Sequence, residues 1–438
     1  MSNKRKALLS FMLVSAMAAG CGEGKSDGSS VTQDVKTPEN KPREPVELTL
    51  VPFYLTMNDQ EYEELLFQPL KSKYPHITIK VNRTDPEKLA AAGEFPDIFY
   101  VANVRYYVFK NLDIPYDMSE LVKKSGLNLN AFSNPNMDWI RELGPNGEVF
   151  GLPFDLNHYA LFYNKDIFDK RGVPYPKDGM TWEDVLELSR KLTFAEGNVQ
   201  YRGFVPPGPN VFSGTRTMPV YDPLNKKALL NDSRYNYKSI LELVKSFYDI
   251  PGIIVNNQYP INGADFIKDQ NVAMYANWIT DTASRMQKEN VKMNFDIVGM
   301  PSFSDLPGVT IHSGAKMMGI SKTSKYKEDA FLAIEFFTSP EVQKKINRGG
   351  RLTALADESI RRDFAADVEV LKGKNIAGAL SVKPAKMIPP HEYNAVIDGK
   401  LNATVADLAK GTKDINTLLR EAQEAADKAI AEAEAMKK

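Results

Sequence analysis

From about residue 46 onward, short apolar runs alternate with longer stretches in which apolar residues recur at helical spacing. Residues 46–54, 77–81 and 97–101 are short and rich in β-branched and aromatic side chains, which predicts strands. Residues 59–73 have the periodicity of one helix face, and a short helix is expected near residues 87–92. Strands that alternate with helices predict a parallel sheet with helical crossovers.

A second region of the same kind begins near Phe150. Thr181 is expected to cap its first helix, because Asp184 follows three residues later, close to a capping box. The chain shows no internal repeat, and this succession of elements predicts an α/β fold. The expected strands are residues 160–163, 272–276, 295–298 and 315–320, and the expected helices are residues 181–192, 237–248, 280–289, 327–338, 341–347 and 414–435.

Residues 1–20 have the pattern of a signal peptide rather than of a folded segment. Three basic residues, Lys4 to Lys6, precede an apolar run over residues 7–17, which is too short to span a bilayer as an anchor but fits the apolar part of a signal peptide. Cys21, the only cysteine, then stands where bacterial lipoproteins are lipidated. The segment resembles a lipobox, with Ala18 where leucine is commonest. The alternative is an ordinary secretory signal with an incidental cysteine.

Residues 22–45 are rich in Gly, Ser, Asp, Lys, Glu and Pro and nearly free of large apolar residues. Such a segment cannot bury enough surface to fold, which predicts a flexible tether. No later stretch is a candidate for crossing a membrane. We therefore expect a signal peptide at 1–20, a lipidated tether at 21–45, and a protein anchored by lipid to the outer face of the bacterial cytoplasmic membrane.

Composition narrows the functional class. A formal net charge of −1 gives none of the electrostatic footprint of a nucleic-acid binder. One cysteine excludes a disulfide within the chain, and the four histidines lack the spacing of metal ligands, so we expect no metal and no other cofactor. No motif of a serine hydrolase, a P-loop enzyme or a zinc protease is present, which predicts a protein that is not an enzyme.

Two other classes stay open at this point. A glycoside hydrolase that uses paired carboxylates leaves no sequence motif, so a surface lipoprotein of that kind is the enzyme alternative. A structural or adhesive lipoprotein is the third class, and it would not need a cleft that closes on a ligand.

Five segments, in a fixed order, carry a resemblance to a known family. The second segment joins GEVFGLPFD at 147–155 to LFYNKDIF at 161–168 and is the most specific. The others are GEFPDIF at 93–99, residues 176–184 up to Trp182-Glu183-Asp184, residues 272–278 from Val272 to Trp278, and residues 313–341 from Ser313 to Glu341. Together they resemble the family 1 extracellular solute-binding proteins of ABC-type sugar importers, which include maltodextrin-binding protein.

The resemblance covers the chain from about Val46 to its C-terminus and implies a two-lobed periplasmic-binding-protein fold with a hinge and an interlobe ligand cleft. It implies that lobe one comprises residues 46–154 and 281–339, and lobe two residues 155–280 and 340–438. It also implies a monomer that captures a sugar or oligosaccharide and delivers it to the permease subunits of an importer. A ligand that touches both lobes would favour the closed state.

A sugar site needs flat aromatic walls for C–H faces and polar side chains for hydroxyl groups. Ligands gather at the carboxyl ends of strands in α/β lobes, and this places Trp278 first among the candidates. The others are Asp155 and His158 at the lobe crossover, Tyr54 and Asn58 after the first strand, Tyr100 and Asn103 after the third, and Arg351 if the ligand is acidic. Their structural alternatives are a core tryptophan at the hinge, a solvated hinge loop, a helix cap and a surface arginine.

Overall fold

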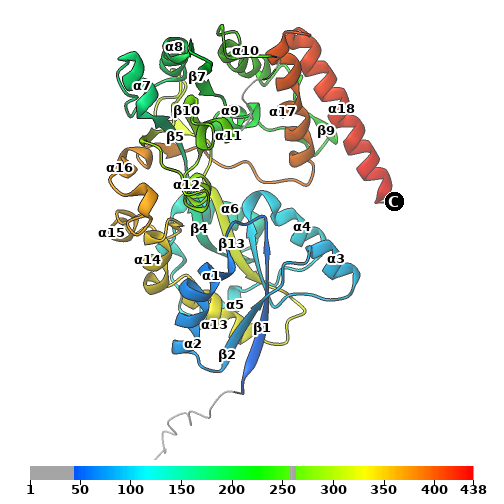
Figure 1. Cartoon of the computed structure of the whole chain (residues 1–438). Helices are drawn as coiled ribbons and strands as arrows, with labels where there is room; N and C mark the ends of the chain where they lie inside the picture. Colours follow the sequence, from blue (N-terminus) through cyan, green and yellow to red (C-terminus); the bar gives the residue numbers. More distant parts are fainter. Residues whose placement is uncertain (1–43, 257, 259–262, 438) are drawn as a thin grey trace, which may run out of the picture. The chain divides into compact units, whose positions relative to one another are not determined.

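The computed structural model describes residues 44–256, 258 and 263–437 (Figure 1). The expected signal peptide, tether and lipidated Cys21 lie outside the described residues, apart from the last two residues of the tether. Within the described part, no helix combines the length and the apolar character that a membrane crossing requires. Mixed helices and strands form two α/β lobes, each built on its own sheet.

The first lobe is built on a six-stranded sheet with the order β14-β4-β13-β3-β1-β2. Strand β1 pairs in parallel with β2 and β3, as predicted, whereas β13 pairs antiparallel with β3 and β4. The sheet is therefore mixed, because β13 returns from the other lobe and enters in the opposite direction. The strands are β1 (Val46–Phe53), β2 (Ile77–Val81), β3 (Ile98–Ala102), β4 (Leu152–Asn157), β13 (Gly314–Ile320) and β14 (Leu352–Thr353).

Helices cover this sheet and seal its apolar side chains. The expected helix over residues 59–73 is present but contains a π-helical turn at Glu63–Phe67 between its α-helical ends. The helices are α1 (Asp59–Tyr62), α2 (Gln68–Lys73), α3 (Pro86–Ala91), α4 (Tyr106–Asn111), α5 (Ser119–Ser125), α6 (Asn134–Leu143), α13 (Lys327–Phe337) and α14 (Pro340–Arg348), with a 3₁₀ turn at Asn103–Arg105.

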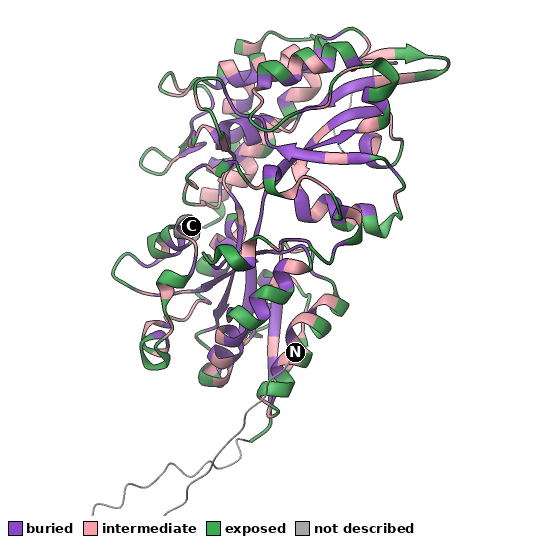
Figure 2. Cartoon of the chain, turned by 90° about the vertical axis from the view of Figure 1, so that its left-hand side faces the viewer, coloured by how far each residue is buried: buried purple, intermediate pink, exposed green. Residues whose placement is uncertain are grey.

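The second lobe is built on a five-stranded sheet with the order β11-β5-β10-β7-β6. Strand β10 lies parallel to β7 and antiparallel to β5, so this sheet is mixed too. Residues of β5 are buried throughout (Figure 2), whereas two of the three residues of the edge strand β6 are exposed. The strands are β5 (Tyr159–Asn164), β6 (Phe194–Glu196), β7 (Val199–Val205), β10 (Val272–Trp278) and β11 (Phe295–Gly299). Two short pairs accompany them, β8 (Tyr221–Asp222) with β9 (Lys227–Ala228) and β12 (Val309–Thr310) with β15 (Lys383–Pro384).

The second lobe also carries the longest helices of the described chain. The predicted cap is confirmed, because Thr181 Oγ1 accepts from the Asp184 amide at 3.3 Å and the Asp184 carboxylate accepts from the Thr181 amide at 2.9 Å. The helices are α7 (Lys165–Arg171), α8 (Trp182–Leu192), α9 (Pro209–Thr215), α10 (Tyr237–Tyr248), α11 (Ala264–Ile267), α12 (Ile279–Lys288), α16 (Ile376–Ala379), α17 (Asn394–Lys410) and α18 (Ile415–Met436). The short helix α15 (Glu358–Arg361) packs against α14 and β14 of the first lobe.

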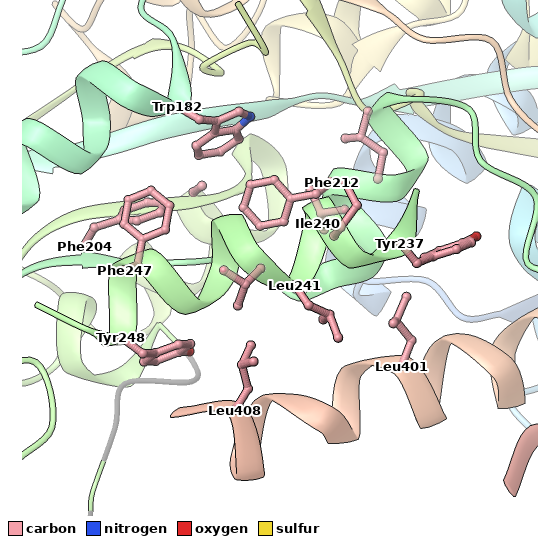
Figure 3. Packing of buried hydrophobic residues seen from close by; sticks show 14 of the residues in the cluster. Trp182, Phe204, Phe212, Tyr237, Ile240, Leu241, Phe247, Tyr248, Leu401 and Leu408 are labelled. Carbon is pink, nitrogen blue, oxygen red and sulfur yellow. The ribbon is translucent and has the colours of Figure 1, made fainter. Parts of the chain in front are cut away.

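Helix α17, which the sequence analysis did not predict, packs beside α18 and against α10 (Figure 1). Its side chains Leu401 and Leu408 are buried in the cluster that also holds Ile240 and Leu241 of α10 (Figure 3). Burial of each such side chain contributes roughly 1.5–3 kcal/mol. These contacts fix which face of α17 is turned away from α10.

Two strands pair outside the lobe that the resemblance implied for their segment. Strand β11, within residues 281–339, pairs with β5 of the second sheet, and β14, within residues 340–438, pairs with β4 of the first. The chain passes directly from β4 to β5 through His158. These pairings extend the second lobe through β11, and the lobe boundaries themselves stay a prediction.

Candidate functional site

A cavity of about 400 Å³ is lined by segments that come from both lobes. The first lobe contributes the turn at Val104 and Arg105, and the second contributes the start of β5, the end of β10, and faces of α9 and α17. The loop residues Ile311, His312 and Met387 complete the wall. A ligand in this space would therefore touch both lobes.

Trp278 and Tyr159 form an aromatic wall of this cavity. Trp278 is the last residue of β10 and Tyr159 the first of β5, and the two are paired neighbours across the strands. Their ring centroids lie 4.3 Å apart with an interplanar angle of 52°. A Cβ atom at Gly314 would lie 3.2 Å from the Trp278 ring, so glycine there gives the indole its room. Trp278 thus lines a cavity, and its contact with a ligand stays a prediction.

Polar side chains from two helices form another part of the wall. Asn394, Asp398 and Asn402 come from α17, and Asn210 comes from α9. The Asn402 side-chain oxygen accepts from the Asn210 amide at 3.3 Å, which ties the two helices together. Burial raises the pKa of Asp398 from its usual value to about 6.

The first lobe contributes the cation Arg105 to the wall, and this cation contacts an exposed aromatic ring. The Arg105 guanidinium lies 4.0 Å from the centroid of the Tyr54 ring and donates to the Tyr107 hydroxyl at 2.9 Å. Tyr54 is 61% exposed and has a φ of +58°, a left-handed conformation that costs a non-glycine residue free energy. Arg105 lines the cavity, whereas Tyr54 contacts Arg105 and does not line the cavity itself.

A second cavity, of about 490 Å³, adjoins the first. The two share Tyr159, Asn210, Val211 and Asn402 as common wall residues. Asn277, next to Trp278, lines the second cavity. Tyr159 therefore contributes to the wall of both cavities.

The structure brings Asp155, Tyr100 and Arg351 together in a buried polar network that stands apart from the cavity lining. Asp155 accepts from the Tyr100 hydroxyl at 3.0 Å and from Lys316 Nζ at 3.1 Å, and Arg351 lies 3.7 Å away. The Arg351 guanidinium also donates hydrogen bonds to both oxygens of the Glu61 carboxylate, at 2.8–3.0 Å. Asp155 and Tyr100 have no exposed surface, so these contacts tie strands and helices of the first lobe together.

His158 and Asn103 lie close to the cavity but contact it through neighbours. Burial lowers the pKa of His158 to about 4, and its ring nitrogens lie 3.4 Å from the Ser313 hydroxyl and the Val382 carbonyl. The Asn103 side chain donates to Met387 Sδ at 2.6 Å, and Met387 itself lines the cavity. Both residues are placed to position the wall.

Asn58 serves as a helix cap in this structure. Its side-chain oxygen accepts from the Glu61 amide at 3.0 Å, and the Glu61 carboxylate accepts from the Asn58 amide at 2.8 Å. This capping box begins α1. Ligand contact by Asn58 stays a prediction, and this geometry gives it no support.

Sequence reasoning missed the polar face that α17 turns to the cavity. Asn394, Asp398 and Asn402 follow one another at intervals of four residues, which places them on one helix face. That spacing was the available signal. Arg105, Asn210 and Tyr159 carried no comparable local signal, because their chemistry depends on how distant segments meet.

Comparison with known proteins places the chain in a family. Residues 56–344 match the family described as bacterial extracellular solute-binding protein. The arabinooligosaccharide-binding protein of Bacillus subtilis (strain 168) is 29% identical over 202 residues, which cover 43% of this chain and 42% of that relative. The sn-glycerol-3-phosphate-binding periplasmic protein UgpB of Shigella flexneri is 30% identical over 87 residues, 20% of this chain and 17% of that relative. The chain thus spans less than half the length of these curated relatives.

A solved structure shows the same fold along nearly the whole chain. It is an ABC substrate-binding protein from Listeria monocytogenes in complex with cycloalternan, with a TM-score of 0.69 and 18% sequence identity. The superposition covers 89% of this chain and 100% of the other. With the family match over most of its length, this protein belongs to the bacterial extracellular solute-binding proteins.

Proposed function

We propose that this protein captures a sugar or oligosaccharide in the cavity beside Trp278 and delivers it to the permease subunits of an ABC importer. The observation that carries the proposal is the wall of Trp278 and Tyr159, which lines one cavity with the polar side chains of α17. Aromatic rings suit the C–H faces of sugars, and asparagine and carboxylate groups suit hydroxyl groups.

The names of similar proteins support this ligand class. The relative from Bacillus subtilis binds arabinooligosaccharide, and the structure from Listeria monocytogenes holds cycloalternan. The relative from Shigella flexneri binds sn-glycerol 3-phosphate, so an anionic ligand is the competing choice within the same family.

Delivery to a permease requires a ligand-dependent change of shape. Arg105 comes from the first lobe and Trp278 from the second, and both line the cavity. A ligand that binds both favours the closed arrangement by its greater affinity for it. A monomer tethered through a lipid on Cys21, at the outer face of the cytoplasmic membrane, would keep the closed form near its importer.

The hydrolase alternative finds less support in the cavity. Glycoside hydrolysis by the usual route needs two carboxyl groups that flank the scissile bond. Among the described residues that line the cavity, Asp398 is the one carboxylic acid.

A ligand screen by thermal unfolding tests the proposal. A ligand that binds only the native state increases the free energy of unfolding, by about 2.7 kcal/mol at a ligand concentration one hundred times Kd. The melting temperature rises as a result. We expect this rise with neutral oligosaccharides. Release of reducing ends would favour the hydrolase, and no response to any sugar would contradict the proposed function.

A further inference from the structure

Three polar side chains form a stripe along α17. Asn394, Asp398 and Asn402 stand four residues apart on consecutive turns and all line the first cavity. Because a helix rises about 1.5 Å per residue, the stripe is about 12 Å long. Asn402 also lines the second cavity, so the stripe continues from one cavity into the other.

The orientation of this stripe is fixed by the buried face of the same helix. Ile397, Leu401 and Leu408 are buried in the core cluster of the second lobe, and Figure 3 shows Leu401 and Leu408 on the side of α17 that faces α10. At 3.6 residues per turn, the polar stripe lies about 90° around the helix from this apolar face. Packing therefore holds the stripe toward the cavities.

Small residues leave the space in front of the stripe open. Ala395 and Gly399 line the first cavity beside Asp398, and a Cβ atom added at Gly399 would meet nothing within 4 Å. Ala403 and Ala406 line the second cavity. A ligand can thus approach the polar groups along the whole length of the stripe.

The stripe has free hydrogen-bonding capacity. Within residues 44–256, 258 and 263–437, the side chains of Asn394 and Asp398 have no hydrogen-bond or ion-pair partner of their own. Asn402 accepts from Asn210 through its side-chain oxygen, which leaves its NH₂ group available as a donor. In the empty site, a half-buried carboxyl without a partner costs free energy. A ligand that donates hydrogen bonds to it would offset this cost.

The charges around Asp398 do not neutralise it. Arg105 and His312 share its cavity, and Tyr237 of α10 is near enough that Asp398 helps to raise the Tyr237 pKa. Arg105 contacts the uncharged Tyr54 and Tyr107, and burial lowers the pKa of His312. Burial alone raises the pKa of Asp398, so the Arg105 charge does not offset the cost of ionising it. Helix α9 contributes Asn210, Val211, Ser213 and Gly214 to this cavity, and all four are uncharged.

Resting on the proposed function, we propose that α17 selects neutral oligosaccharides: Asn394, Asp398 and Asn402 bind hydroxyl groups of successive sugar units that lie across both cavities. The ionised Asp398 accepts hydrogen bonds from ligand hydroxyls and repels phosphates and uronates. The Trp278 and Tyr159 rings provide the apolar contact. A monosaccharide can occupy one cavity only, so it uses part of the stripe.

This arrangement makes affinity depend on pH. Ligand hydroxyls donate to the ionised form of Asp398, so the bound state favours ionisation. In the empty protein burial holds the pKa of Asp398 at about 6. Affinity for a neutral oligosaccharide is therefore expected to fall by up to about tenfold for each pH unit below that value and to level off above it.

The test measures affinity by calorimetry between about pH 5 and pH 8. The probes are arabinotriose, maltotriose and mannotriose, with arabinose, sn-glycerol 3-phosphate and a galacturonate trimer for comparison. Asp398→Asn removes the charge and keeps the shape. Asp407→Asn makes the same change on the same helix, at a carboxylate that pairs with Lys413 outside both cavities.

We expect at least one neutral trimer to bind the wild type more tightly than the monosaccharide and both anions. Asp398→Asn should weaken that trimer by at least about tenfold near pH 8 and should abolish the pH dependence, as expected for a lost charge-assisted hydrogen bond. Asp407→Asn should retain the wild-type affinity and pH profile.

Three outcomes would overturn the inference. If a neutral trimer binds the wild type and Asp398→Asn equally, α17 does not select the ligand, although the proposed function stands. If an anionic probe binds as tightly as the best neutral trimer, the selection is wrong. If no probe binds the wild type, the proposed function fails together with the inference.

Discussion

Trp278 and Tyr159 stand opposite each other on antiparallel strands, and their tilted rings form one wall of a cavity that both lobes line. Strand pairing fixes their separation, so the wall exists before any ligand arrives. A preformed aromatic surface of this kind binds without the cost of ordering its side chains.

Replacing Trp278 by alanine should weaken sugar binding by about 1–3 kcal/mol, because an anchoring aromatic supplies both area and geometry. Calorimetry with the tightest sugar from the ligand screen measures the loss. Trp278→Phe retains a flat ring and should lose less. An unchanged affinity in the alanine variant, with unliganded melting like that of the wild type, would contradict the assignment.

Much of the fold was predictable because its signals are local. Residues 77–81 alternate in β-rich composition, and Thr181 and Asp184 make their cap within one turn, so neither depends on distant segments. Helix α17 was not predicted, although Ile397, Leu401 and Leu408 have helical spacing. Gly399 near its centre weakens the helical signal by about 1 kcal/mol relative to alanine.

The site was predictable only in part, for a different reason. Trp278 ends a strand, and strand ends meet at ligand sites. Asp155 lies inside β4, between β13 and β14, and this position brings Lys316 of β13 and Arg351, which precedes β14, close to its carboxylate. That neighbourhood follows from pairing over more than 150 residues, which no local pattern reveals.

The buried network around Asp155 should be needed for stability. Asp155→Ala leaves Lys316 without its partner and Arg351 with Glu61 alone, and breaking a buried pair costs about 3–5 kcal/mol. Urea unfolding measures the change. Glu328→Ala removes an exposed pair with Lys124 and should cost less than about 1 kcal/mol. Equal costs for the two variants would contradict a structural role for Asp155.

Cys21→Ala should move the protein from the membrane fraction to the soluble fraction without altering the fold, if the cysteine carries the lipid anchor. Fractionation of cells that express the full chain, followed by thermal unfolding of the purified protein, checks both points. Ser29→Ala, a change within the expected tether, is the matched control and should stay with the membrane. Persistent membrane attachment of Cys21→Ala would refute lipidation at this position.

Asp398 should make the empty protein less stable as the pH rises. Its pKa is raised from 3.8 to about 6 in the folded state, so the folded chain holds the proton more tightly than the unfolded chain. The resulting stability is complete below pH 3.8 and is lost as the pH rises through about 6. Asp398→Asn cannot ionise, so it should match the wild type near pH 4 and exceed it by about 1–3 kcal/mol near pH 8.

Urea unfolding of the unliganded proteins at both pH values measures this difference, and other titrating groups cancel between wild type and variant. Asp407→Asn is expected to show the opposite sign, because hydrogen bonds from Lys413 and Thr412 lower the pKa of Asp407 and its stabilisation is present above pH 3.8. A stability difference for Asp398→Asn that does not change with pH would mean that this carboxyl is not destabilised by burial. If Asp398→Asn gains stability and loses sugar affinity, then the ionised Asp398 lowers the stability of the empty protein, and ligand binding offsets that loss.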